Sequence, residues 1–280
     1  MSVNREMIVS AQNKYVSLTR GLANKKNREN ERKFRFDGVK LMCEAIRKGA
    51  QIEFALVSEK ELDSVLEKAK SLYGIKETEM PERILPVAAH VFERISEENA
   101  PEGVICVAKY MDGLHSDAEA ESLSNLDLSE NVLLLESVRD PQNVGAIIRV
   151  AAAFGVDRIV MSRDCADVYN AKTIRASMGT VFGTRIDRVS DLPEAVKSLM
   201  ASGRRVFAAA LARDAARLGE FSIEKGDCVI IGNEGHGLSE QAIAACTRPV
   251  FIPMAEQVES LNAATAAAVL VWEFFGSGMK

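Results

Sequence analysis

Three polar stretches of the sequence each follow an apolar run of the kind that forms a buried strand. They are "DPQNVGAIIR" (140–149), "GNEGHGLS" (232–239) and "IPMAEQVESLNAA" (252–264). Arg149 can hold a phosphate through two parallel hydrogen bonds and keeps its proton at neutral pH. Glu234 lies among glycines, which allow a backbone to approach a flat ligand closely. These residue types indicate a site for a nucleotide-like ligand.

Each of these residues also has a plainer explanation. Arg149 can extend its charged end from a half-buried helix, and its spacing from Asn143 does not place both on one helical face. Asn262 can cap the last helix, although Ser260 is the stronger candidate for that cap. His236 can act as a general base, but a loop histidine among glycines more often has no catalytic role.

Several classes of site lack their sequence signature. Gly232, Gly235 and Gly237 give GxxGxG, which is not the GxGxxG order of a dinucleotide-binding turn, and there is no Walker or GxSxG sequence. The three histidines are widely separated, so we expect no metal site. The five cysteines are odd in number and form no CxxC pair, which favours buried free thiols in a reducing cytoplasm. No apolar run is long enough to span a bilayer.

From residue 131 onward, short apolar runs alternate with helical patterns, which predicts a mainly parallel sheet covered by helices. In such a sheet ligands bind beyond the carboxyl ends of the strands, where the three polar stretches lie. The expected strands are "VLLLESV" (132–138), "DRIVMS" (157–162), "RRVFAAAL" (204–211), "DCVIIG" (227–232) and "PVFIPM" (249–254). The expected helices cover residues 143–155, 171–178, 192–201, 239–246 and 260–276.

The first part of the chain predicts a smaller α/β domain preceded by a basic helical arm. We expect the arm at 1–30, the domain at 31–110 and a polar, acidic linker at 111–130. Within the domain we expect helices at 37–49 and near 61–73, strands at 52–58 and 103–110, and two short elements near 84–95.

Charge is distributed unevenly along the chain. Residues 1–50 contain 12 basic and 5 acidic side chains, which leaves 23 basic and 35 acidic side chains in the remainder. A basic arm on an acidic body is typical of proteins that bind nucleic-acid phosphates, although it is also compatible with a solvated helical surface.

Taken together, the three stretches resemble motifs 1, 2 and 3 of the SpoU (TrmH) family of RNA ribose 2′-O-methyltransferases in the SPOUT superfamily. "NVGAIIRVAAAFGVD" is similar to motif 1, "IIGNEGHGLS" to motif 2 and "IPM…ESLNAATAAAV" to motif 3. The resemblance covers residues 131–280, and residues 10–45 more loosely resemble the helical arm and L30e-like RNA-binding domain of many members. It implies a SPOUT domain with a deep trefoil knot, S-adenosyl-L-methionine as cofactor, an RNA substrate and a homodimer.

The resemblance also implies roles for individual residues. Asn143 and Arg149 are expected at an RNA ribose and its phosphate, with Arg149 serving a site that the partner subunit completes. Further site residues are Glu234, Ser260 and Asn262, and the expected cofactor contacts are Gly232, Ile252, Met254 and Leu261. A ribose hydroxyl is a very weak acid, so the protein must align it and assist the developing alkoxide. Arg149 can polarise the hydroxyl or stabilise the anion, and its high pKa argues against a role as base.

Two positions depart from the motifs, because Gln142 and Glu256 stand where many members have glycine. If the backbone there needs a positive φ, these side chains adopt it reluctantly. The leading hypothesis is an RNA 2′-O-methyltransferase that acts on ribosomal RNA, since the separate N-terminal domain favours ribosomal over transfer RNA. The alternatives are a tRNA 2′-O-methyltransferase, an inactive RNA-binding protein of the same fold, and a dinucleotide-dependent oxidoreductase, which the missing GxGxxG disfavours.

Overall fold

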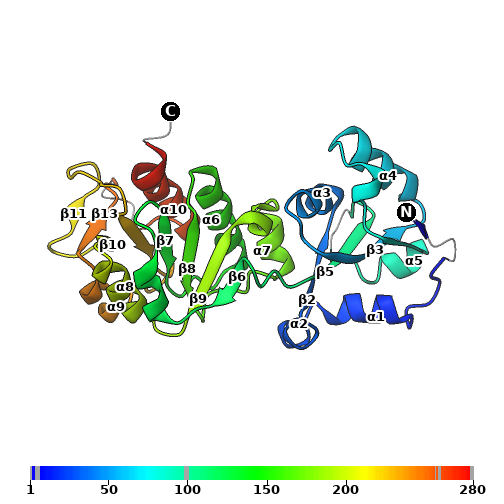
Figure 1. Cartoon of the computed structure of the whole chain (residues 1–280), viewed down its shortest axis with the longest axis horizontal. Coiled ribbons are helices and arrows are strands. Elements are labelled where there is room, and N and C mark those ends of the chain that lie inside the picture. The colour runs from blue at the N-terminus through cyan, green and yellow to red at the C-terminus, as the bar shows by residue number, and fades with distance from the viewer. Residues whose placement is uncertain (1, 4–6, 98–100, 256, 258–259, 278–280) are drawn as a thin grey trace. The chain divides into compact units, whose positions relative to one another are not determined.

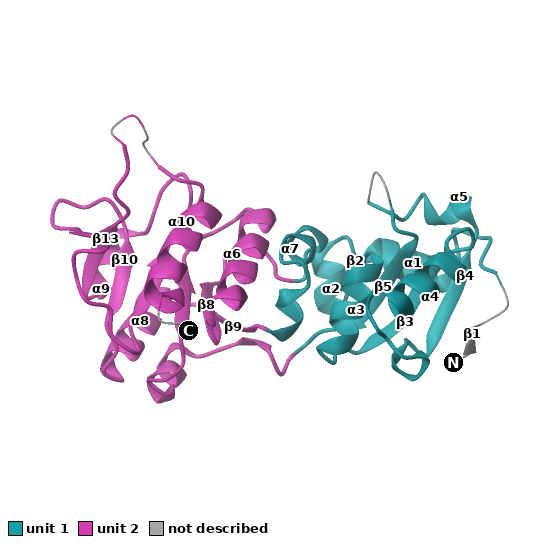
Figure 2. Cartoon of the chain, turned by 90° about the horizontal axis from the view of Figure 1, so that it is seen from above, with its two compact units in different colours: residues 1–111, 169–183 teal, residues 112–168, 184–280 magenta. Residues whose placement is uncertain are grey.

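The computed structural model describes residues 2–3, 7–97, 101–255, 257 and 260–277. The chain divides into two compact units, which Figure 2 colours separately. Unit 1 comprises residues 1–111 and 169–183, and unit 2 comprises residues 112–168 and 184–280. That residues 169–183 belong to unit 1 was not expected from the sequence. This segment belongs there because helix α7 (Ala171–Ala176) packs on strand β2 (Lys33–Asp37) and the Tyr169 ring lies 4.7 Å from that of Phe34.

Unit 1 contains a mixed sheet whose order in the described residues is β1-β4-β3-β5-β2. Strand β5 runs antiparallel to both β3 and β2, whereas β4 runs parallel to β3 and to β1. Apart from β2, the strands are β1 (Ser2–Val3), β3 (Ile52–Ser58), β4 (Arg83–Val87) and β5 (Val104–Lys109). Strand β2 follows a highly charged run and was not expected, because its apolar residues are only Phe34 and Phe36.

In the region expected to be a basic helical arm, the described residues include two short helices. Helix α1 (Lys14–Gly21) starts at Asn13, whose side chain accepts a hydrogen bond from the Tyr15 amide, and α2 (Lys25–Glu31) starts in the same way at Asn24. Such caps fix where a helix begins. Val16 and Leu22 are fully buried against the core of unit 1. The remaining helical elements of unit 1 are α3 (Val39–Arg47), α4 (Leu62–Ser71), η1 (Glu77–Glu79), α5 (Ala89–Phe92) and η3 (Thr180–Gly183).

Unit 2 contains a sheet whose order in the described residues is β11-β13-β10-β12-β7-β8-β9-β6, with every neighbouring pair parallel. The parallel sheet expected from the alternation of strands and helices is therefore confirmed. Its strands are β6 (His115–Asp117), β7 (Val132–Leu135), β8 (Arg158–Ser162), β9 (Arg185–Val189), β10 (Val206–Ala209), β11 (Ala216–Arg217), β12 (Cys228–Ile231) and β13 (Arg248–Phe251).

Helices cover both faces of this sheet (Figure 1). The central strand β7 is an unbroken apolar run because it is buried on both faces. Val132 and Leu134 belong to the core beneath α8 and α9, so Leu133 and Leu135 point to the opposite face. The helical elements are η2 (Ala120–Asn125), α6 (Pro141–Ala153), α8 (Leu192–Ala201), α9 (Glu240–Ala245), α10 (Ala263–Val271) and the π-helical turn η4 (Trp272–Gly276).

The stretch 111–130, expected to be a linker, contributes the edge strand β6 and the turn η2 to unit 2. The strand pairs with β9, and Ser116 donates a 2.7 Å hydrogen bond to Asp187. Edge strands tolerate polar side chains because one side stays open, which is why hydrophobicity alone does not reveal β6. Among the described residues, no helix is long and apolar enough to cross a membrane.

Candidate functional site

Three loops meet at one edge of the unit 2 sheet. They follow β7, β12 and β13. Strand β12 pairs in parallel with β7, with Ile231 opposite Leu135, and β10 lies between β12 and β13. The carboxyl ends of parallel strands share an edge, so the three polar stretches of the sequence are brought together there.

The first loop leads into α6, whose start is strongly defined. The Asp140 side chain accepts a 2.8 Å hydrogen bond from the Gln142 amide, and Pro141 occupies the first turn. Gln142 is helical and is not among the described residues with positive φ, so it causes no strain where many relatives carry glycine. The other departure, Glu256, lies outside the described residues.

Asn143, Glu234 and Asn262 form a hydrogen-bonded chain that joins the three loops. The Nδ2 of Asn143 donates to Oε1 of Glu234, and the Oδ1 of Asn143 accepts a 3.0 Å bond from Nδ2 of Asn262. Asn143 is only 9% exposed. Glu234 and Asn262 are 91 and 119 residues from Asn143 in the sequence, so only the fold brings them together.

Asn262 also caps helix α10, which corrects the expectation that Ser260 is the cap. Its Oδ1 accepts hydrogen bonds from the Ala264 amide at 2.9 Å and the Thr265 amide at 3.3 Å. With its oxygen engaged by the helix, the Asn262 amide group is oriented so that Nδ2 reaches Asn143. Ser260 instead is exposed and lines a cavity.

The glycine-rich loop after β12 turns back on itself. Asn233 and Gly237 form an isolated β-bridge, and Oδ1 of Asn233 accepts hydrogen bonds from the Gly235 and His236 amides at 2.8 and 3.2 Å. A Cβ on Gly232 would lie 2.5–2.6 Å from backbone atoms of Gly237 and its neighbour. Only glycine fits at position 232, because the loop backbone passes directly over it.

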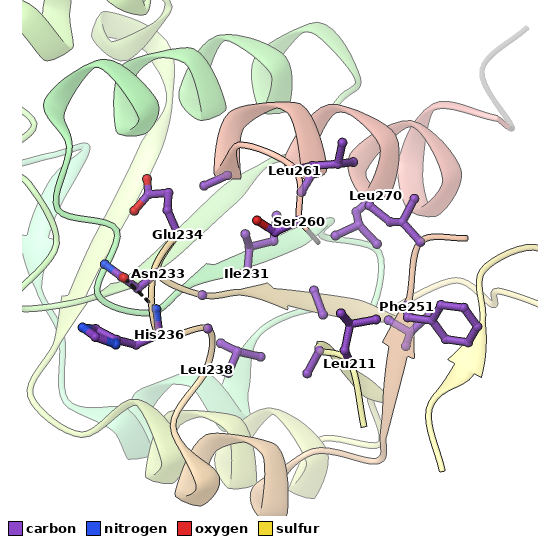
Figure 3. A pocket seen from close by; sticks show the side chains of 18 of the residues that line it. Leu211, Ile231, Asn233, Glu234, His236, Leu238, Phe251, Ser260, Leu261 and Leu270 are labelled. Carbon is purple, nitrogen blue, oxygen red and sulfur yellow. Dashed lines mark hydrogen bonds between the residues drawn. The ribbon is translucent and has the colours of Figure 1, made fainter. Parts of the chain in front are cut away.

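Behind this loop lies a cavity of about 500 Å³. In Figure 3 its apolar side chains include Leu211, Phe251 and Leu270, with Glu234 and His236 toward one side of the view and Phe251 toward the other. All four residues expected to contact a cofactor line this cavity, namely Gly232, Ile252, Met254 and Leu261. The volume and the mostly apolar lining suit a small organic molecule of cofactor size.

Arg149 is separated from this cavity. It is exposed on α6, and no hydrogen bond or ion pair joins its side chain to another described residue. Six residues along an α-helix correspond to about 9 Å of axial rise and about 240° of rotation. Asn143 therefore faces inward while Arg149 faces away, as their spacing predicts. His236 is exposed on the loop, and only its backbone amide has a bond described above.

Three residues that shape the glycine-rich loop were not expected from the sequence: Glu136, Asn233 and Ser239. Both oxygens of the buried Glu136 carboxylate accept 2.7 Å bonds from Ser239, one from its amide and one from its hydroxyl. Asn233 donates a 2.8 Å bond to the Ser137 carbonyl. For Glu136, the sequence offers one indication of such a role, which is that this acidic residue directly follows the apolar run "VLLL".

The base of the loop is supported by a polar cluster around Asp164. Burial raises the pKa of this carboxyl, but hydrogen bonds from Ser137, Ser162 and Arg139 outweigh burial and hold the pKa below its ordinary value. The Ser137 hydroxyl donates to Asp164 at 2.6 Å, and the Ser137 amide donates to Ser162 at 2.9 Å. Ser137 is thereby held at a φ of 54°, a conformation that residues other than glycine rarely adopt.

Among the described residues, no group of three or more histidine, cysteine, aspartate or glutamate side chains could hold a metal ion. The polar side chains at the carboxyl edge include the Glu234 carboxylate, the amides of Asn143, Asn233 and Asn262, the Ser260 hydroxyl and the His236 imidazole, beside a largely apolar cavity.

Comparison with known proteins agrees with this geometry. Residues 130–272 match the model of the SpoU rRNA methylase family, and residues 13–106 match the MRM3-like substrate binding domain. The chain is 30% identical over 272 residues to 23S rRNA (guanosine(2553)-2′-O)-methyltransferase RlmP of Bacillus subtilis, covering 97% of this chain and 100% of that protein.

Solved structures share this fold over nearly the whole chain. An AdoMet-bound rRNA methyltransferase from Sinorhizobium meliloti superposes with a TM-score of 0.80 at 25% identity, covering 98% of this chain and 99% of the other. An RNA 2′-O ribose methyltransferase superposes with a TM-score of 0.79 at 25% identity, covering 96% and 97%. By its family match, its near full-length relative and its site geometry, the chain belongs to the SpoU family of RNA 2′-O-methyltransferases, with an N-terminal MRM3-like substrate-binding domain.

Proposed function

We propose that this chain methylates a ribose 2′-hydroxyl of ribosomal RNA with S-adenosylmethionine as methyl donor. The observation that carries the proposal is the chain of Asn143, Glu234 and Asn262 at the edge of a cavity of about 500 Å³. The Bacillus subtilis relative is named as a 23S rRNA 2′-O-methyltransferase, and the Sinorhizobium meliloti structure is described as AdoMet-bound.

The residues present fit S-adenosylmethionine. Apolar side chains line most of the cavity, while the backbone of the tight loop at Gly232 offers amides and carbonyls to a polar ligand. Ile252, Met254 and Leu261 would hold the cofactor from the other loop. When bound, this cofactor supplies a methyl group already activated on a sulfonium.

The protein's own contribution is alignment and charge. Asn143 holds Glu234 beside the cavity and is itself held by Asn262, and Ser260 lines the same cavity. Arg149 would hold the RNA phosphate and stabilise negative charge that develops on the ribose oxygen. Preorganised groups of this kind lower a barrier because they need no rearrangement during the reaction.

The proposed substrate is ribosomal and not transfer RNA. Unit 1 contains the segment that matches a substrate-binding domain, and helices α1 and α2 carry exposed basic side chains such as Arg20 and Lys26. These side chains would bind RNA phosphates. The free cysteines favour a reducing cytoplasm as the location of the protein. We also propose that unit 2 contains the deep trefoil knot of the family.

We further propose a homodimer in which Arg149 of one copy serves the site of the other. Arg149 points away from its own cavity, so it would act there only across an interface. Val269 and Trp272 are 38% and 49% exposed on α10 and the following turn, which packs against α6 through a ring contact of 5.3 Å between Trp272 and Phe154. Tryptophan is enriched at protein interfaces relative to the rest of the protein surface.

Transfer of a labelled methyl group from S-adenosylmethionine to RNA tests the activity. We expect label in ribosomal RNA prepared from cells that lack the protein, and little in transfer RNA. Label only in transfer RNA would make the tRNA alternative correct. RNA binding with no transfer to either substrate would favour the inactive RNA-binding protein.

Mixing two inactive variants tests the shared site. Arg149→Ala should lose about a hundredfold in rate while keeping cofactor affinity, since one such stabilising group contributes roughly 3 kcal/mol. Glu234→Ala should also be inactive. Mixed dimers should regain part of the activity, because one of their two sites contains both residues. Absence of recovery after confirmed subunit exchange would mean that one chain completes its own site.

A further inference from the structure

The residue pair Glu136–Ser137, which directly follows β7, contacts both ends of the glycine-rich loop 232–239. Glu136 binds the end of the loop at Ser239, and the Ser137 carbonyl binds its beginning at Asn233. Neither Glu136 nor Ser137 lines the cavity. The loop residues from Gly232 to Leu238 do line it.

The burial of Glu136 needs an explanation that stability alone does not provide. Its side chain is 8% exposed, and no ion pair joins it to a described basic residue. A buried carboxylate without a positive partner is costly unless its oxygens are hydrogen-bonded. Here both oxygens are bonded, and both donors belong to one residue, Ser239. An apolar side chain would fill this place at lower cost, so the carboxylate is best explained by what it holds.

Ser239 is the point where the loop ends and α9 begins. Its hydroxyl donates to Glu136 and also accepts a 3.1 Å bond from the Ala242 amide. The hydroxyl therefore links the carboxylate to the first turn of the helix. The loop is tightly folded between its anchors, with the Gly232 backbone pressed against that of Gly237. A shift at either anchor would move the backbone groups that face the cavity.

We propose that Glu136 is a positioning residue for the cofactor site, which sets the shape of loop 232–239 by holding Ser239 before any ligand binds. The inference rests on the proposed function, because it assumes that this loop contacts the cofactor. Ser137, held at positive φ by Ser162 and Asp164, supplies the second anchor through Asn233. Preorganising the loop reduces the ordering that binding would otherwise require.

Full-length protein and its variants test this by calorimetric titration with S-adenosylmethionine. Glu136→Ala removes both acceptors. We expect the dissociation constant for S-adenosylmethionine to rise at least about tenfold, because hydrogen bonds to a charged group are stronger than those between neutral groups. In turnover, the KM for the cofactor should rise similarly while kcat at saturating cofactor stays within about twofold. Glu136→Gln keeps one acceptor and can donate to the Ser239 hydroxyl, so it should recover much of the affinity.

A second pair of variants, at Ser239, tests the same proposal if Glu136→Ala does not fold. Ser239→Ala removes one donor and should weaken cofactor binding several-fold, and Ser239→Thr keeps the hydroxyl and should bind nearly as the unmodified protein does. The matched control is Asp187→Ala, because Asp187 is also a buried carboxylate of unit 2 but bonds Ser116 and Arg158 at strands β6 and β8. It should lower the melting temperature without changing the dissociation constant.

The outcomes separate the two proposals. If the unmodified protein does not bind S-adenosylmethionine, the proposed function fails. If it binds, but the Glu136 and Ser239 variants bind equally well and only melt earlier, the positioning role is wrong and Glu136 serves stability alone.

Discussion

Replacing Asn143 by aspartate removes one hydrogen bond of the site with almost no change in shape. In the structure Nδ2 of Asn143 donates to the Glu234 carboxylate, while its Oδ1 accepts from Asn262 at 3.0 Å. Asn143→Asp keeps the acceptor for Asn262 but places a second carboxylate against Glu234. Two unit charges about 4 Å apart repel by roughly 4 kcal/mol at an effective dielectric constant of 20.

The expected cost is lower than that figure because the pair is only partly buried. Asn143 is 9% exposed and Glu234 is half-buried, so solvent screens some of the repulsion. We expect Asn143→Asp to reduce the free energy of unfolding of unit 2 by about 2–3 kcal/mol at pH 8. The loss should shrink as the pH falls, since one proton shared between the two carboxylates removes the repulsion.

The double variant Asn143→Asp/Glu234→Gln supplies the matched control. The glutamine introduced in place of Glu234 would donate to the aspartate introduced in place of Asn143. The bond then exists again with its direction reversed, and stability should return to within about 1 kcal/mol of the original. Denaturant unfolding can be followed by fluorescence of Trp272, which is the only tryptophan and belongs to unit 2. Methyl transfer by the double variant then reports whether the Glu234 carboxylate has a role beyond this bond.

Two results would refute the reasoning. Asn143→Asp as stable as the original protein at pH 8 would mean that the two side chains do not interact closely. A double variant no more stable than Asn143→Asp would mean that the hydrogen bond is not what joins the loops.

Three further predictions concern the loop, the basic helices and the thiols. Gly232→Ala should abolish cofactor binding because its Cβ would lie 2.5 Å from backbone, whereas Gly235→Ala, with its nearest neighbour at 3.5 Å, should bind normally in calorimetry. Lys26→Ala should weaken RNA binding and reduce the salt slope by about one, with Lys197→Ala on α8 as a neutral control in filter binding; equal slopes would exclude a phosphate contact. Cys246 should resist iodoacetamide in the folded protein at pH 8, because burial and the nearby Glu136 raise its thiol pKa to about 12; rapid labelling seen by mass spectrometry would contradict this.

Much of the fold follows from local sequence patterns. The run "VLLL" predicts a strand buried on both faces, and β7 is fully buried at the centre of a parallel sheet. The run "IEFALVS" coincides with β3 at Ile52–Ser58. These elements were predictable because a strand of this kind is recognised from the apolar residues of one short stretch of sequence. β2, β6 and β9 were not expected, because each carries several polar side chains that other elements or an open edge accommodate.

The sequence alone determined which residue types are available and where the strands end. It placed Asn143, Glu234 and Asn262 after three different strands, and parallel strands present those ends at one edge. Tertiary structure alone decided which side chains meet. Asn143 bonds both others across 91 and 119 residues, Asn262 and not Ser260 caps α10, and Glu136 holds Ser239 across 103 residues. Strand and helix formation depend on neighbouring residues, whereas these contacts depend on strand order, which the sequence pattern does not encode locally.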